Sequence, residues 1–117
     1  MDSRLEDFAK VIVNTSTRVQ KDDTVLIQIV DDGQNLAIEI YKEVIRVGGH
    51  PLILVTPSEA TRAFYEIAED EVLMTMPRHQ YELVKASDVI ISIKSSSNTK
   101  SLSNVDPKKI TLALFSC

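Results

Sequence analysis

Three short apolar runs alternate along this chain with longer segments in which apolar residues recur every three or four positions. The runs cover residues 25–30, 52–55 and 89–93 and are rich in Val and Ile. Runs that are apolar at nearly every position are typical of strands covered on both faces, as in a parallel sheet. The pattern therefore predicts three parallel strands that are joined by helices.

The segment from Thr24 to Thr56 is a complete β-α-β unit. Its helix follows Asp31-Asp32-Gly33 and ends at Gly48-Gly49, and glycine commonly ends helices because it tolerates the left-handed backbone conformation. A right-handed crossover places this helix on one face of the sheet. Its predicted inner face consists of Leu36, Ala37, Ile40, Tyr41, Val44 and Val47.

Capping patterns locate two more helix starts. Ser3 and Glu6 form a capping box with Ser3 as the N-cap, and the helix is predicted to run to about Val19. In the second pattern Thr56 is the predicted N-cap and Pro57 the first helical residue. Both helices carry apolar residues at helical spacing.

Proline residues separate the remaining elements. Pro77 divides a short helix near residues 70–76 from a further helix at 78–85, because proline lacks the backbone donor of a helix interior. The final segment, from Pro107, is open to two interpretations. Asp106-Pro107 favours a helix start, which we prefer, whereas the alternation of apolar residues at 110, 112 and 114 is equally that of a strand.

The order of elements predicts the α/β class, as a small Rossmann-like three-layer α-β-α domain with a mainly parallel sheet. With 117 residues, the chain is expected to be a single domain over residues 1–117.

Composition narrows the partners and the compartment. The net charge of −4 argues against nucleic acid and anionic membrane, which both attract cationic surfaces. A single cysteine, Cys117, allows no internal disulfide, as expected in the cytoplasm. We see no signal peptide, and no apolar run reaches the roughly 20 residues of a membrane span.

The carboxyl end of the first strand is the place where ligands bind in open α/β sheets. It carries Asp31 and Asp32, whose two carboxylates would repel a phosphate, and neither glycine-rich nucleotide fingerprint occurs in the chain. We therefore interpret this turn as structural, with Asp32 as the N-cap of the following helix.

Metal ligands are scarce. The chain has two histidines, His50 and His79, and His79 stands three residues before Glu82 on a predicted helix. One such pair is better explained as a solvated surface pair than as a metal site, and His50 as a loop residue. The acidic residues from Glu66 to Glu71 are interpreted as a solvated helix junction.

Nucleophiles also lack the neighbours that catalysis needs. Ser95-Ser96-Ser97 follows the third strand and Lys94, but no base is placed for it, so a small hydrolase built on this loop is the weakest hypothesis. Nothing in the sequence activates Cys117. The residues themselves therefore assign no catalytic, cofactor-binding or metal residue.

An ordered series of short segments nevertheless resembles a known family. The segments are Val19–Ile27, Leu36–Gly49, Ile67–Leu73, Ala86-Ser87-Asp88 and Val105–Ile110, with Arg62 and Pro77 between them. Together they resemble the amino-terminal domain of the thermophilic metallo-aminopeptidase family, of the aminopeptidase T and aminopeptidase S type. The resemblance covers nearly the whole chain.

This resemblance implies a cytoplasmic, homo-oligomeric exopeptidase that releases N-terminal amino acids from peptides with two divalent metal ions. The family's metal ligands belong to a carboxy-terminal domain that is missing here, so the resemblance implies no cofactor in this chain, which alone is expected to be inactive. Its peptide substrate would be shared with that domain. The alternative is a stand-alone small-ligand-binding or assembly module that uses the strand ends near Asp31, Thr56 and Lys94.

Overall fold

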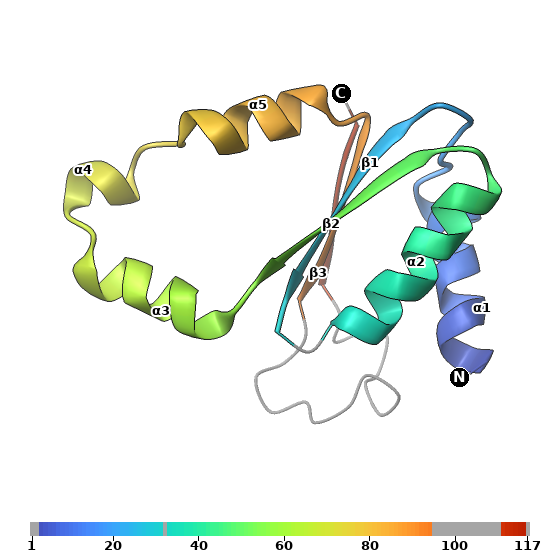
Figure 1. Ribbon diagram of the computed structural model, residues 1–117, viewed down its shortest axis with the longest axis horizontal. Helices are drawn as coiled ribbons and strands as arrows, with labels where there is room; N and C mark the ends of the chain where they lie inside the picture. Colours follow the sequence, from blue (N-terminus) through green and yellow to red (C-terminus); the bar gives the residue numbers. More distant parts are fainter. Residues whose placement is uncertain (1–2, 32, 95–110, 117) are drawn as a thin grey trace.

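The computed structural model describes residues 3–31, 33–94 and 111–116, with side chains up to residue 93 (Figure 1). Helices and strands alternate along most of the chain. In order, the elements are α1 (Ser3–Val11), the π-helical turn η1 (Ile12–Ser16), β1 (Thr24–Val30), α2 (Gln34–Arg46), β2 (His50–Thr56), α3 (Ser58–Ile67), α4 (Asp70–Leu73), α5 (Arg78–Ala86), β3 (Val89–Lys94) and β4 (Thr111–Ser116).

The strands form one sheet in the order β2-β1-β3-β4. The central strand β1 pairs in parallel with both β2 and β3, so that Leu26 lies between Leu52 and Ile90. The α/β class and the mainly parallel sheet predicted from the sequence are therefore confirmed.

The fourth strand corrects the preferred prediction for the end of the chain. Residues 111–116 form β4, antiparallel to β3, and not a helix. The alternation of apolar residues was the decisive signal, because β3 offers an open edge to which an alternating segment can hydrogen-bond. Residues 107–110 lie outside the described part of the chain.

One face of the sheet carries the core. Helices α1 and α2 and the turn η1 cover this face, which Figure 1 shows on the right of the strands. The alternation along β1 points Val25, Ile27 and Ile29 into this layer. Ile91 and Ile93 of β3 lie in the same core cluster. The helices and η1 contribute further fully buried side chains: Ala9, Ile12, Val13, Leu36, Ala37, Ile40 and Val44. Of the predicted inner face of α2, Val47 is partly buried and Tyr41 is exposed.

Helix α2 ends in a Schellman motif. The N–H of Gly48 donates to Ile45 O and the N–H of Gly49 donates to Val44 O, both at 2.9 Å. Gly48 has a φ of +88°, which favours glycine. The end of the helix is therefore as predicted. At its start the N-cap position is Gly33, not Asp32, which lies outside the described residues.

The first helix is shorter than its apolar pattern suggested. α1 begins at Ser3, which is a helical residue instead of an N-cap, and it ends at Val11 before η1. The hydroxyl of Thr17 donates to Ile12 O at 2.9 Å and helps to close this turn. Val19 lies beyond the helix but is still buried in the core.

Residues 58–86, comprising α3, α4 and α5, form an arch beside the other face of the sheet (Figure 1). None of its three helices contains a buried residue. Pro77 is the N-cap of α5, which confirms the predicted break. Within the described ranges, no helix is long and apolar enough to cross a membrane.

Candidate functional site

The carboxyl ends of β1 and β2 meet at the edge where open α/β sheets bind ligands, and where the alternative hypothesis expected a small-ligand site. Asp31 follows β1 in the left-handed conformation, with a φ of +52°, and its N–H approaches Thr56 O at 3.4 Å. Its carboxylate Oδ1 accepts the N–H of Ser58, the first residue of α3, at 2.7 Å. Asp31 therefore caps the arch.

This arrangement corrects the predicted start of the third helix. Pro57 is the N-cap residue, with an extended backbone, and not the first helical residue. Neither Pro57 nor Thr56 caps the helix with its side chain. The capping carboxylate is that of Asp31, which is distant in sequence. The capping-box pattern relates residues only three positions apart, so it cannot identify a capping residue this distant in the sequence.

The same contact affects the charge of Asp31. The Ser58 side chain and then its backbone N–H lower the pKa of Asp31 below the ordinary 3.8, against a smaller opposing effect of desolvation. The carboxylate is therefore held in its charged form at the positive end of α3. A second anion at this helix end would meet that negative charge, in agreement with the structural interpretation of the turn.

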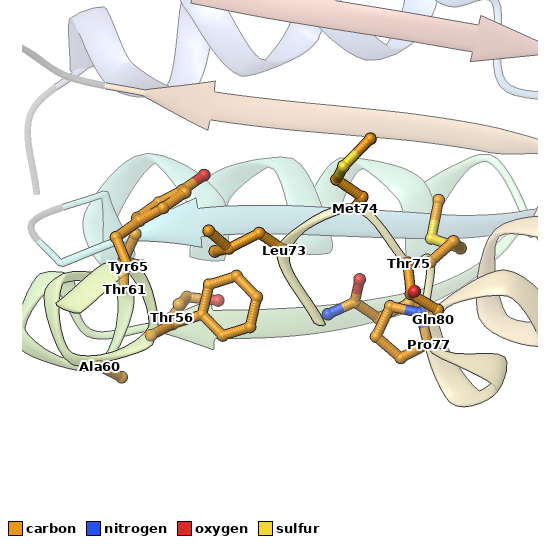
Figure 2. Close-up of a pocket in the computed structure, with 11 residues that line it drawn as sticks. Thr56, Ala60, Thr61, Tyr65, Leu73, Met74, Thr75, Pro77 and Gln80 are labelled. Atoms are coloured by element: carbon orange, nitrogen blue, oxygen red, sulfur yellow. The ribbon is translucent and has the colours of Figure 1, made fainter. Parts of the chain in front are cut away.

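Two adjoining hollows lie under the arch, with volumes of about 550 and 540 Å³. Figure 2 shows the first, in which side chains of α3 and of the turn after α4 gather around Thr56 and Gln80. The second extends from the arch to the sheet, where Gln28, Leu54 and Ser92 line it. Together the two hollows make the space under the arch a concave region of the described residues.

A polar pair stands on the sheet side of the second hollow. Gln28 of β1 and Ser92 of β3 are register partners, and the hydroxyl of Ser92 donates to Gln28 Oε1 at 2.9 Å. Both interrupt strands that are otherwise almost entirely apolar. This pair was not predicted from the sequence, although a polar residue within each apolar run was its visible signal.

The two histidines are not brought together with other ligands. His50 is the first residue of β2, and its Nε2 lies 3.8 Å from Asp22 Oδ1. His79 and Glu82 are both exposed on α5. Within the described residues, no three side chains of His, Cys, Asp or Glu are grouped so as to hold a metal ion. These residues do not fit the donor set of a two-metal site.

Two buried glutamates on α2 were also missed. Glu39 and Glu43 are 2% and 5% exposed, and each pairs with the cation three residues later. Lys42 Nζ lies 3.1 Å from Glu39, and Arg46 pairs with Glu43. The Glu-x-x-Lys and Glu-x-x-Arg spacing was the available signal. Both carboxylates are neutralised locally, which is a structural role.

Several candidates cannot be placed. Ser95, Ser96, Ser97 and Cys117 lie outside the described residues, and Lys94 ends β3 without a described side chain. The acidic residues Glu66, Glu69, Asp70 and Glu71 are all exposed, in agreement with a solvated junction.

Comparisons with known proteins agree with the predicted resemblance. The family described as thermophilic metalloprotease (M29) matches residues 1–114. The solved structure of wild-type AmpT from Thermus thermophilus superposes with a TM-score of 0.62 at 19% identity. That similarity covers 92% of this chain and 28% of AmpT, and it shows a shared fold.

A second similarity concerns a different protein. The flavin prenyltransferase UbiX of Chlamydia trachomatis serovar D is 30% identical over 86 residues, which are 70% of this chain and 45% of UbiX. The chain therefore spans less than half the length of each of these two proteins.

Proposed function

Because this chain belongs to the thermophilic metalloprotease (M29) family, we propose that it serves as the amino-terminal, non-catalytic domain of a metal-dependent aminopeptidase. The match over residues 1–114 carries this proposal, and the fold shared with AmpT supports it. In this role the domain shapes or covers a cleft for the peptide substrate and leaves peptide hydrolysis to another part of the enzyme.

The chemistry of the described residues supports this division between a non-catalytic domain and a catalytic part. Hydrolysis by two metal ions needs a cluster of carboxylate and imidazole ligands, and no such cluster occurs in the described ranges. We therefore propose that the divalent ions of the enzyme are bound outside this domain, and we assign no catalytic step to it.

Two experiments test this role. In the first, the 117-residue chain is incubated with Zn²⁺, Co²⁺ or Mn²⁺ and leucine p-nitroanilide, and we expect no release of nitroaniline. Metal-dependent turnover would refute the division of labour. In the second, the reading frame beyond Cys117 is sequenced. An in-frame continuation that carries Glu, His and Asp ligands supports the peptidase proposal, and a stop codon at that point contradicts it.

We also propose that the domain acts in the cytoplasm as part of a homo-oligomer. Strand β2 supports the second point, because it lies at the edge of the sheet with Leu52, Leu54 and Val55 exposed. Light scattering after gel filtration measures the mass directly. A monomeric mass at every concentration tested would contradict self-association through this chain.

A second candidate function is a small-ligand-binding module without catalysis. It is favoured by the concave region under the arch and by the 30% identity to a flavin prenyltransferase. This function predicts quenching of the fluorescence of riboflavin, an uncharged flavin, when the chain is added, whereas the peptidase role predicts none. Gel filtration with riboflavin gives an independent readout, because bound flavin elutes with the protein.

A further inference from the structure

The two hollows under the arch form one continuous groove, here called the arch groove. They share five lining residues, which come from the end of β2, from α3, from the turn after α4 and from the start of α5: Thr56, Thr61, Tyr65, Met76 and Gln80. One end of the groove lies against α4 and the other against the sheet. A ligand therefore has access to both the arch and the strands.

The walls of the arch groove are uncharged. About a quarter of the chain is charged, at 26%, yet none of the described residues that line either hollow is Asp, Glu, Lys, Arg or His. An ion placed here would lose part of its hydration without gaining an opposite charge. The groove therefore discriminates against charged ligands.

The floor of the groove offers directed hydrogen bonds. Because Ser92 donates to Gln28 Oε1, the two Nε2 hydrogens of Gln28 are left as donors within the described part of the chain. No buried side-chain nitrogen or oxygen in the described residues lacks a partner, so this amide nitrogen is accessible. It is a donor suited to a carbonyl oxygen.

Apolar side chains surround this donor. Leu54 of β2 and Leu83 and Val84 of α5 line the same hollow, and the exposed ring of Tyr65 lies where the two hollows meet. Ligand sites in proteins commonly combine apolar walls with a few polar groups that orient the ligand. We infer that the arch groove binds an uncharged molecule that carries an amide next to an apolar group.

This proposal concerns binding alone and does not depend on the peptidase role. The amide carbonyl accepts from Gln28 Nε2, and the apolar group contacts the walls formed by Leu54 and Leu83. Free amino acids and carboxylates are excluded, because the groove offers no counter-charge among its described residues.

The test uses N-acetyl-leucinamide, titrated into the ¹⁵N-labelled chain and followed by NMR. We expect saturable shifts of the Gln28 side-chain amide and of backbone signals in β1 and α3. The charged analogues N-acetyl-leucine and leucinamide should bind at least ten-fold more weakly. Equal binding of all three compounds, or no saturable shift at the Gln28 amide, would overturn the proposal.

Two pairs of variants locate the site. Gln28→Leu removes the donor and should weaken binding by about five-fold, the usual net worth of one hydrogen bond. Gln34→Leu, an exposed glutamine on α2, is its control and should leave binding unchanged.

The second pair of variants is needed in case Gln28→Leu, which lies in the sheet, impairs folding. Tyr65 is 66% exposed and lines both hollows, so Tyr65→Ala should weaken binding several-fold in a folded chain. Tyr81→Ala, 52% exposed and outside the linings, is the matched control. If the Tyr65 and Tyr81 variants bind equally well, the arch groove is not the site.

Discussion

The carboxylate of Asp31 accepts the backbone N–H of Ser58 at 2.7 Å, across 27 residues of chain. The residue directly after β1 thus caps the helix that follows β2. A left-handed φ of +52° at Asp31 turns its side chain toward this helix end. Two requirements therefore meet at one position: a hydrogen-bond acceptor and tolerance of the left-handed conformation.

Substitutions at Asp31 should separate these two requirements. Asparagine keeps an acceptor and tolerates the left-handed conformation, glycine keeps only the conformation, and alanine keeps neither. We expect melting temperatures in the order Asp31, Asp31→Asn, Asp31→Gly and Asp31→Ala, from highest to lowest. Thermal unfolding followed by circular dichroism measures this order. If alanine equals glycine, the backbone conformation contributes nothing.

The charge of Asp31 should make part of this stability depend on pH. Because its pKa is lower in the folded chain than the ordinary 3.8, the unfolded chain binds protons more readily as the pH falls. The stabilisation is therefore complete above 3.8 and is lost as the pH drops through the folded-state pKa. The advantage of the native chain over Asp31→Asn should shrink below pH 3.8 in urea titrations. An advantage that is independent of pH would contradict a charged cap.

Substitution of the adjacent glycines Gly48 and Gly49 should lower the stability of the fold for different reasons. At Gly48 the φ of +88° disfavours alanine by roughly 1 kcal/mol, and asparagine should cost less because it tolerates positive φ. At Gly49 an added Cβ would lie 2.9 Å from Val44 Cγ1 and 3.2 Å from Asp23 O. Alanine there should cost about 1–3 kcal/mol, as for an overpacked core.

Asparagine distinguishes the two positions. It should partly restore stability relative to alanine at Gly48 but give no improvement at Gly49, because the clash at Gly49 begins at the Cβ. Urea unfolding of the four variants provides the comparison. Improvement by asparagine at both positions would mean that conformation, and not contact, limits Gly49.

Lys42 should contribute more to the stability of the fold than other lysines on helix surfaces. Its Nζ lies 3.1 Å from Glu39, whose side chain is only 3% exposed. Lys42→Ala leaves that carboxylate buried without this partner, which should cost about 1–3 kcal/mol. Lys10→Ala, an exposed lysine on α1, is the control and should change stability by less than about 0.5 kcal/mol. A double variant with Glu39→Gln should recover part of the loss.

Most strands and helices could be predicted from the sequence, because the residue patterns that specify them are local. The apolar runs correctly predicted β1, β2 and β3, and Gly48 correctly predicted the end of α2. The preferred helix was wrong over residues 111–116, because the choice between helix and strand depended on pairing with β3, which is a tertiary contact. Asp31 illustrates the same limit: its partner Ser58 is close only once β1 and β2 are paired.

The concave site was less predictable than the fold. Gln28 and Ser92 each appear as one polar residue in an apolar run, and nothing local shows that they are register partners. Likewise, the uncharged lining of the arch groove comes from three strands and from the helices of the arch. Pairing and curvature determine which residues gather there, and both depend on the whole sheet.

The arch is attached to the sheet at its two ends. Asp31 holds the start of α3, and at the other end the Thr24 hydroxyl donates to Ala86 O at 2.7 Å while Asp88 accepts the N–H of Thr24 at 2.9 Å. Between these attachments its helices bury no residue. Amide hydrogens of residues 58–86 should therefore exchange with solvent by local unfolding, well before those of β1. A protease at low concentration should cut the native chain first within this segment, leaving the strands intact.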